Sequence, residues 1–273
     1  MEIKYIDIHS HLGFEDYGPD KNEVIKRMHE AGVGTIAIGA DLESSREAVK
    51  VATETENIWA CIGMHPNHNV VEIFSEKNYE ELVKNPKVVA IGECGLDYFF
   101  RDEKIISDKL KVESYKERQK TEFKKQIEFA IKYDKALMLH IRDGEIKGEA
   151  FDDAYQILKE QCQGSTLTLR GDIHFFTGKL EMAQKFIDLG FTISFVGLIT
   201  YVHDFDKIIK NVPLTSLQAE TDAPYVAPVP HRGERNEPSY VIEIYKKIAE
   251  IRGEDPEIVR LQLLANARRV FGV

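Results

Sequence analysis

Six side chains of the types that bind divalent metal ions come at the downstream ends of short apolar segments. These histidines and carboxylates are His9, His11, Glu93, His140, His174 and Asp222. Ligands so far apart in the sequence can converge only if the segments are parallel strands of one sheet, so that their carboxyl ends lie at the same end of it. Histidine and carboxylate ligands at such strand ends are typical of a hydrolase that uses metal-activated water.

The strength of this prediction lies in the whole set of ligands rather than in any one of them. His9 and His11 are two residues apart, so both side chains point the same way from a strand, as chelation requires. A lone His-x-His pair also occurs by chance, and His140 or His174 taken singly could be a core histidine. Together, at equivalent strand ends, they favour a metal site.

Glu93 is a carboxylate placed directly after a run of apolar residues, between Gly92 and Cys94. Its burial would be costly unless it were paired or bound to a cation. One carboxylate can bridge two ions, an arrangement common in phosphoester cleavage. Asp222 precedes Ala223-Pro224, where a strand must end. It could be a turn residue, or a ligand that also holds or deprotonates the attacking water.

A second group of polar residues is expected around the same mouth and could bind the substrate. These residues are His65, Arg142, Arg232 and Asn236. Guanidinium groups suit phosphate oxygens because they donate two parallel hydrogen bonds. The alternative, that these are solvated loop residues, remains open for each of them.

Eight short segments rich in Val, Ile, Leu and Phe have the composition of buried parallel strands. They are Lys4–His9, Thr35–Ala40, Ile58–Met64, Val88–Glu93, Ala136–Ile141, Leu169–Phe175, Phe191–Val196 and Leu217–Asp222. Amphipathic helical segments alternate with them, which predicts an α/β fold, a (β/α)8 TIM-type barrel forming one domain over residues 1–273. A doubly wound sheet has the same order of elements, but it would gather ligands at one switch point rather than from five strands. The charged segment Arg101–Gln119 is expected to be an irregular loop over the barrel mouth.

The composition restricts the class of protein and its partners. Of 273 residues, 43% are apolar and 30% are charged, which is ordinary for a soluble enzyme. No apolar run reaches the roughly 18 residues that cross a bilayer, and the N-terminal residues do not resemble a secretory signal, so we expect a cytoplasmic protein without membrane contact. The formal net charge of −10 disfavours nonspecific binding along nucleic acid. Divalent ions in a local pocket would still admit a phosphodiester.

Several motifs occur in an order that resembles a known family. They include His9-Ser10-His11-Leu12, Gly63-Met64-His65-Pro66, Gly92-Glu93-Cys94-Gly95-Leu96-Asp97, Leu139-His140-Ile141-Arg142-Asp143 and Glu220-Thr221-Asp222-Ala223-Pro224. From residue 6 to residue 271 the chain resembles the TatD-type metal-dependent hydrolases of the amidohydrolase superfamily, commonly described as deoxyribonucleases. It departs from the usual pattern after Leu12 and at Phe175, which affects the expected shape of the substrate and not the metal ligands.

The resemblance implies a barrel with two divalent ions, Mg²⁺, Mn²⁺ or Zn²⁺, on the six ligands. We interpret Glu93 as the bridge and Asp222 as the proton acceptor, the two catalytic residues. His9, His11 and Asp222 would hold one ion, and His140 and His174 the other. The predicted activity is 3′→5′ exonuclease cleavage of DNA at single-stranded ends, with the direction taken from the resemblance alone.

Two other functions remain open. The same metal-activated water could attack a carbonyl, so an ester or amide hydrolase such as a deacylase is the alternative enzyme. A non-catalytic binding protein that has kept the fold is the alternative of another class. It is disfavoured because loss of catalysis should have relaxed at least one ligand.

Overall fold

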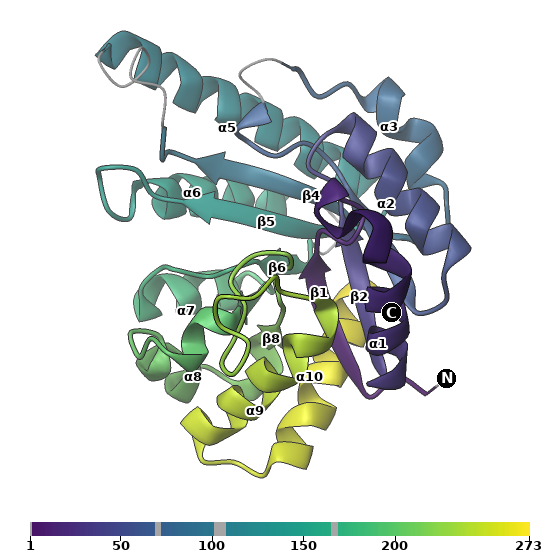
Figure 1. Ribbon diagram of the computed structural model, residues 1–273. Coiled ribbons are helices and arrows are strands. Elements are labelled where there is room, and N and C mark those ends of the chain that lie inside the picture. Colours follow the sequence, from purple (N-terminus) through teal and green to yellow (C-terminus); the bar gives the residue numbers. More distant parts are fainter. Residues whose placement is uncertain (1, 69–71, 101–107, 165–168) are drawn as a thin grey trace.

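A computed structural model describes residues 2–68, 72–100, 108–164 and 169–273 (Figure 1). Eight parallel strands form one sheet in which each strand pairs with the next along the chain. They are β1 (Tyr5–Ser10), β2 (Val33–Ile38), β3 (Ile58–Ile62), β4 (Val88–Asp97), β5 (Ala136–Arg142), β6 (Gly171–Ile173), β7 (Thr192–Phe195) and β8 (Leu217–Ala219).

The sheet closes on itself where the chain following β8 meets the end of β1. Ser10 and Ala223 form a parallel bridge. The main-chain N–H of Asp222 donates to His9 O at 3.0 Å, and that of His11 donates to Ala223 O at 2.7 Å. Main-chain hydrogen bonds therefore join His9 of β1 and His11 just after it to the segment that carries Asp222. The predicted (β/α)8 barrel is confirmed.

Helices follow the strands around the barrel (Figure 1). They are α1 (Lys21–Glu30), α2 (Leu42–Glu54), α3 (Glu76–Val83), α5 (Lys109–Lys132), α6 (Glu149–Gly164), α7 (Leu180–Asp188), α8 (Asp206–Asn211), α9 (Val241–Arg252) and α10 (Pro256–Phe271). Short 3-10 helices cover Glu15–Asp20, Gly197–Thr200, Leu214–Ser216 and Pro238–Tyr240. In the part of the chain that the structure describes, no helix has both the length and the apolarity to cross a membrane.

Two clusters of buried apolar side chains hold these elements together. The larger cluster joins the strands to the surrounding helices and includes Phe123 of α5 and Phe186 of α7. The smaller one joins Ile6 and Ile36 of the first two strands, and residues of the next three, to Phe271 of α10. Because apolar burial is the main force that stabilises a fold, the strand ends that carry the polar residues are held by a rigid scaffold.

The conformation predicted for one segment at the barrel mouth is wrong for most of that segment. The segment Arg101–Gln119 was expected to be irregular, but α5 begins at Lys109, and residues 101–107 lie outside the described part of the chain. The carboxylate of Asp108 caps the helix by accepting hydrogen bonds from the first main-chain N–H groups. Lysine and glutamate are good helix formers. Lys116 also forms an ion pair with Glu149 of α6 at 2.8 Å.

Strand β4 extends four residues beyond Glu93, where the sequence predicted its end. The extension pairs with β5 so that Gly95 lies opposite His140. A Cβ atom on Gly92 would lie 2.4 Å from Met138 O, and one on Gly95 would lie 2.1 Å from His140 O. Only glycine allows this close approach, and both glycines have positive φ. The sequence around Glu93 therefore brings β4 close against β5.

Candidate metal centre

The six predicted ligands converge at the carboxyl-terminal end of the barrel. His9 lies in β1, Glu93 in β4 and His140 in β5, while His174 directly follows β6. All but His9 line a cavity of about 590 Å³, called the mouth cavity below. His9 is fully buried beneath it, and Glu93 is only 4% exposed. The strands thus deliver ligands from distant parts of the sequence to one place, as the spacing predicts.

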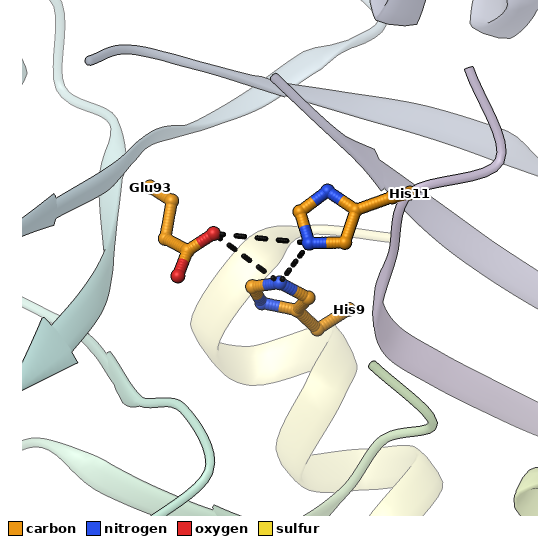
Figure 2. A group of neighbouring side chains, drawn as sticks. All are labelled: His9, His11 and Glu93. Carbon is orange, nitrogen blue, oxygen red and sulfur yellow. Dashed lines mark hydrogen bonds and ion pairs between the residues drawn. The ribbon is translucent and has the colours of Figure 1, made fainter. Parts of the chain in front are cut away.

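Four of the donor atoms form a compact group, the first donor set, three of whose residues are drawn in Figure 2. His9 Nε2 and His11 Nε2 are 3.4 Å apart, and they lie 3.6 and 3.9 Å from Glu93 Oε2. Asp222 Oδ1 completes the set at 3.6 Å from His9 Nε2 and 3.4 Å from His11 Nε2. Donors about 2.0–2.2 Å from a tetrahedral ion stand about 3.3–3.6 Å apart. All the separations above but that of His11 from Glu93 lie in this range, and His9, His11 and Glu93 form a group that could hold a metal ion.

The other oxygen of Glu93 belongs to a second donor set. Glu93 Oε1 lies 2.9 Å from His140 Nδ1 and 2.8 Å from His174 Nε2, and these two nitrogens are 3.3 Å apart. The two oxygens of one carboxylate are thus divided between two groups of imidazole donors. The contacts of 2.8 and 2.9 Å are hydrogen bonds, shorter than the spacing of two ligands on one ion, and they leave Glu93 with one oxygen toward each group.

His140 is oriented by a carboxylate that sequence reasoning missed. Its Nε2 lies 3.1 Å from Asp97 Oδ2, which also accepts a hydrogen bond from Asn67 Nδ2 at 3.0 Å. Metal-binding histidines usually use the second ring nitrogen in this way, which fixes the tautomer and the ring plane. Asp97 is the last residue of the motif Gly92–Asp97. Because the strand was predicted to end at Glu93, the position of Asp97 beside β5 was missed.

Three further buried acids were missed, and each lies two residues before a predicted ligand. They are Asp7, Asp172 and Glu220. Asp7 accepts hydrogen bonds from Thr221 N at 2.8 Å and Thr221 Oγ at 2.6 Å, and so ties β1 to the segment that carries Asp222. The two-residue spacing was the signal in the sequence that could have found these acids. A buried carboxylate needs a partner, and each of them stands next but one to a predicted ligand.

Glu93 and His174 each favour the charged form of the other. Burial by itself would raise the pKa of Glu93. The charge of His174, with hydrogen bonds from His140 and His174, outweighs burial and holds the pKa well below its usual value. Burial would lower the pKa of His174, but Glu93 and Glu220 raise it well above its usual value. A proton on His174 thus balances the negative charge of these acids, a role that a divalent ion would take when bound.

His65 lies in the wall of the mouth cavity, as predicted. Its Nδ1 accepts a hydrogen bond from the main-chain N–H of Asn67 at 3.1 Å, so the ring proton is on Nε2, 3.7 Å from Glu93 Oε1. Burial and the neighbouring charge of His140 lower the pKa of His65 to about 3. The residue therefore presents a neutral N–H donor to the cavity.

The two predicted arginines are placed differently. Arg142 lines the mouth cavity, and its guanidinium lies over the ring of Phe99 at 4.3 Å from the centroid. Arg232 lies over the ring of Tyr201 at 4.3 Å and is not part of the cavity wall. The guanidinium of Arg142 is thus the better placed to meet a substrate.

The prediction that Asn236 contacts substrate is corrected by its burial. Asn236 is fully buried, and its amide donates to Thr221 O at 2.9 Å and Tyr225 O at 2.6 Å. Its Oδ1 accepts from Glu237 N at 2.9 Å. Its side-chain amide group holds the turn that carries Asp222. The φ of Asp222, 53°, is unusual for a residue with a side chain. Asn236 supports the ligand loop from behind.

Comparison with known proteins agrees with this geometry. The family described as "TatD related DNase" matches residues 6–272. The chain is 35% identical to an uncharacterized metal-dependent hydrolase, YabD, from Bacillus subtilis, over 98% of each chain. It is 30% identical to the uncharacterized metal-dependent hydrolase YjjV from Escherichia coli, over the whole of both chains. The crystal structure of that TatD homologue superimposes with a TM-score of 0.86 over 100% of both chains at 28% identity. This chain therefore belongs to the TatD-related family of metal-dependent hydrolases.

Proposed function

We propose that this chain is a deoxyribonuclease that removes nucleotides from single-stranded 3′ ends with the help of two divalent ions. The observation that carries the proposal is the division of Glu93, whose Oε2 faces the first donor set and whose Oε1 faces the second. Paired ions that share a carboxylate are a common design for hydrolysis of phosphoesters. The DNase description of the matching family supports the same substrate class.

Ions on these ligands would stabilise charge developing on the phosphate oxygens and lower the pKa of water. The chain's own residues have separate tasks. Asp222 lines the cavity while only 9% exposed, so its carboxylate is placed to accept a proton from an attacking water. The Nε2–H of His65 can donate to a non-bridging phosphate oxygen, and Arg142 can pair with the next phosphate.

The size and lining of the mouth cavity favour a single strand as the substrate. Its volume of about 590 Å³ lies within the range of pockets for small molecules, roughly 300–1,000 Å³, so a duplex would not enter. Phe14 and Tyr225 line it near His11, and exposed Phe99 lies at its edge beneath Arg142. Aromatic faces of this kind stack unpaired bases without regard to sequence.

The test uses metal-stripped protein supplied with Mg²⁺, Mn²⁺ or Zn²⁺ in separate reactions. A 5′-labelled single-stranded oligonucleotide should shorten stepwise from its 3′ end, and phosphorothioate links at that end should stop the reaction. Circular single strands and blunt duplexes should resist cleavage. The Glu93→Gln protein is the control for a contaminating nuclease.

Two results would overturn the proposal. Cleavage of an aminoacyl ester or an amide, with no phosphodiester turnover under any metal, would indicate the alternative hydrolase. Absence of turnover on every substrate class, with metal bound, would indicate a binding protein. Internal cleavage of circular strands would refute the exonuclease mode alone.

A further inference from the structure

A buried carboxylate lies beside two ligand rings at once. Glu220 is fully buried, and its Oε2 is 3.9 Å from His9 Nδ1, while its Oε1 is 3.5 Å from His174 Nδ1. The two rings are stacked, with centroids 4.0 Å apart and planes inclined by 13°. The other nitrogen of each ring, Nε2, faces Glu93. One carboxylate thus serves the Nε2 atoms, and another lies next to both Nδ1 atoms.

Three of the four atoms that face one another around Glu220 lack hydrogen-bond partners. Among the described residues, His9 Nδ1, His174 Nδ1 and Glu220 Oε2 are buried side-chain atoms without a hydrogen bond. Buried polar groups are nearly always paired, so three such atoms in mutual proximity indicate hydrogen bonds that form when the ligands are drawn together. Glu220 cannot turn away, because its Oε1 also accepts the main-chain N–H of Phe175 at 2.6 Å.

We propose that Glu220 is a shared positioning residue that accepts Nδ1–H hydrogen bonds from His9 and His174, one ligand of each donor set. These bonds fix both rings in the tautomer that leaves the Nε2 lone pair free for a metal ion. Because one carboxylate orients a ligand of each set, Glu220 couples the two sites through the Nδ1 atoms, as Glu93 couples them through the Nε2 atoms. The proposal rests on the metal-binding part of the proposed function and is independent of the substrate.

The substitution Glu220→Gln separates the two bonds. The Phe175 N–H needs an acceptor, so the glutamine oxygen should take the Oε1 position and remain beside His174. The amide NH2 group would then face His9 Nδ1, where two donors oppose each other. We expect the ion on the first donor set to bind about 10- to 100-fold more weakly, and the ion on the second set to change much less.

Two measurements made without substrate test this. Calorimetric titration of metal-stripped protein with Zn²⁺ gives the two affinities. Long-range ¹H–¹⁵N NMR spectra of the zinc-loaded protein report the histidine tautomers. In the unmodified chain both His9 and His174 should carry a protected Nδ1–H proton, and in Glu220→Gln the signal from His9 should be lost while that from His174 remains. A purely structural role for Glu220 would not separate the two rings.

The matched control is Glu122→Gln. Glu122 is also buried, at 3% exposure, and also accepts a main-chain N–H, that of Phe74 at 2.8 Å. Its other oxygen bonds Lys125 rather than a histidine. This variant should keep both zinc affinities and both Nδ1–H signals.

Equal zinc affinities in Glu220→Gln and the unmodified chain would overturn the proposal, as would retention of the His9 Nδ1–H signal. If the variant does not fold, the spectra of the unmodified zinc-loaded chain decide. Protected Nδ1–H protons on both rings support the proposal, and a zinc ion on either Nδ1 refutes it. An unmodified chain that binds zinc by these ligands but cleaves no DNA would refute only the proposed substrate.

Discussion

Replacing Glu93 by glutamine should be the most damaging single change in the metal centre. The substitution keeps the size of the side chain but removes the charge from both oxygens, and each oxygen faces a separate donor set. A charged polar interaction contributes about 1.5–3 kcal/mol, so the loss of two amounts to about 3–6 kcal/mol. That corresponds to a fall of roughly 10²- to 10⁴-fold in kcat/KM. His174→Ala affects one set only, and a fall of roughly 10- to 100-fold is expected.

The assay compares kcat/KM on a labelled single-stranded oligonucleotide with the metal content of each variant by elemental analysis. Thermal unfolding of the metal-free proteins controls for changes in the scaffold. Turnover of Glu93→Gln near that of the unmodified chain would refute the reasoning and make Glu93 a structural core acid. Equal losses in Glu93→Gln and His174→Ala would show that the two donor sets are not bridged.

Three further predictions follow from the geometry. After dialysis against free metal, elemental analysis should find more than one equivalent per chain, with the ion on the second donor set lost first because that set has fewer carboxylates. Arg142→Ala should lower kcat/KM by about 1–3 kcal/mol without changing metal content, and Arg232→Ala, outside the cavity wall, should lower it less. Asp41→Ala should lower the free energy of unfolding by about 1 kcal/mol in denaturant titrations, because Asp41 caps α2 through Ser44 N at 2.8 Å. Burial raises the pKa of Asp41, but the Ser44 hydrogen bonds outweigh it and the net pKa is lowered. The loss should therefore be full above about pH 4 and shrink as the carboxylate is protonated in acid.

The convergence of the predicted ligands could be foreseen from the sequence because it depends mainly on a single regular feature. In a barrel of parallel strands, the residues at the carboxyl ends of the strands meet whatever their separation along the chain. His9, Glu93 and His140 each belong to such a strand, and His174 directly follows one. No detail of loop conformation was needed to bring them together.

The residues that sequence reasoning missed or misplaced depend instead on register and on turns. Asp97 reaches His140 because β4 continues past Glu93, which required the two glycines to pass close to β5. Asn236 is buried because the turn after β8 folds back over it, and no periodic pattern marks that turn. The first turns of α5, from Lys109 to Gln119, were misread as a loop because helix formers such as lysine and glutamate are also the residues of solvated loops.

The charge distribution explains how a chain of net charge −10 can act on a polyanion. The carboxylates of Glu93, Asp97, Asp222 and Glu220 are gathered around the histidines. They raise the pKa values of His140 and His174, while burial and the charge of His174 lower that of His9. At His140, as at His174, burial opposes the charged ring, but hydrogen bonds to Asp97 and Glu93 prevail. A divalent ion supplies more charge than a proton and has open positions for phosphate oxygens. The carboxylates at the mouth would thus hold the cations needed to bind nucleic acid, although the chain as a whole repels it at a distance.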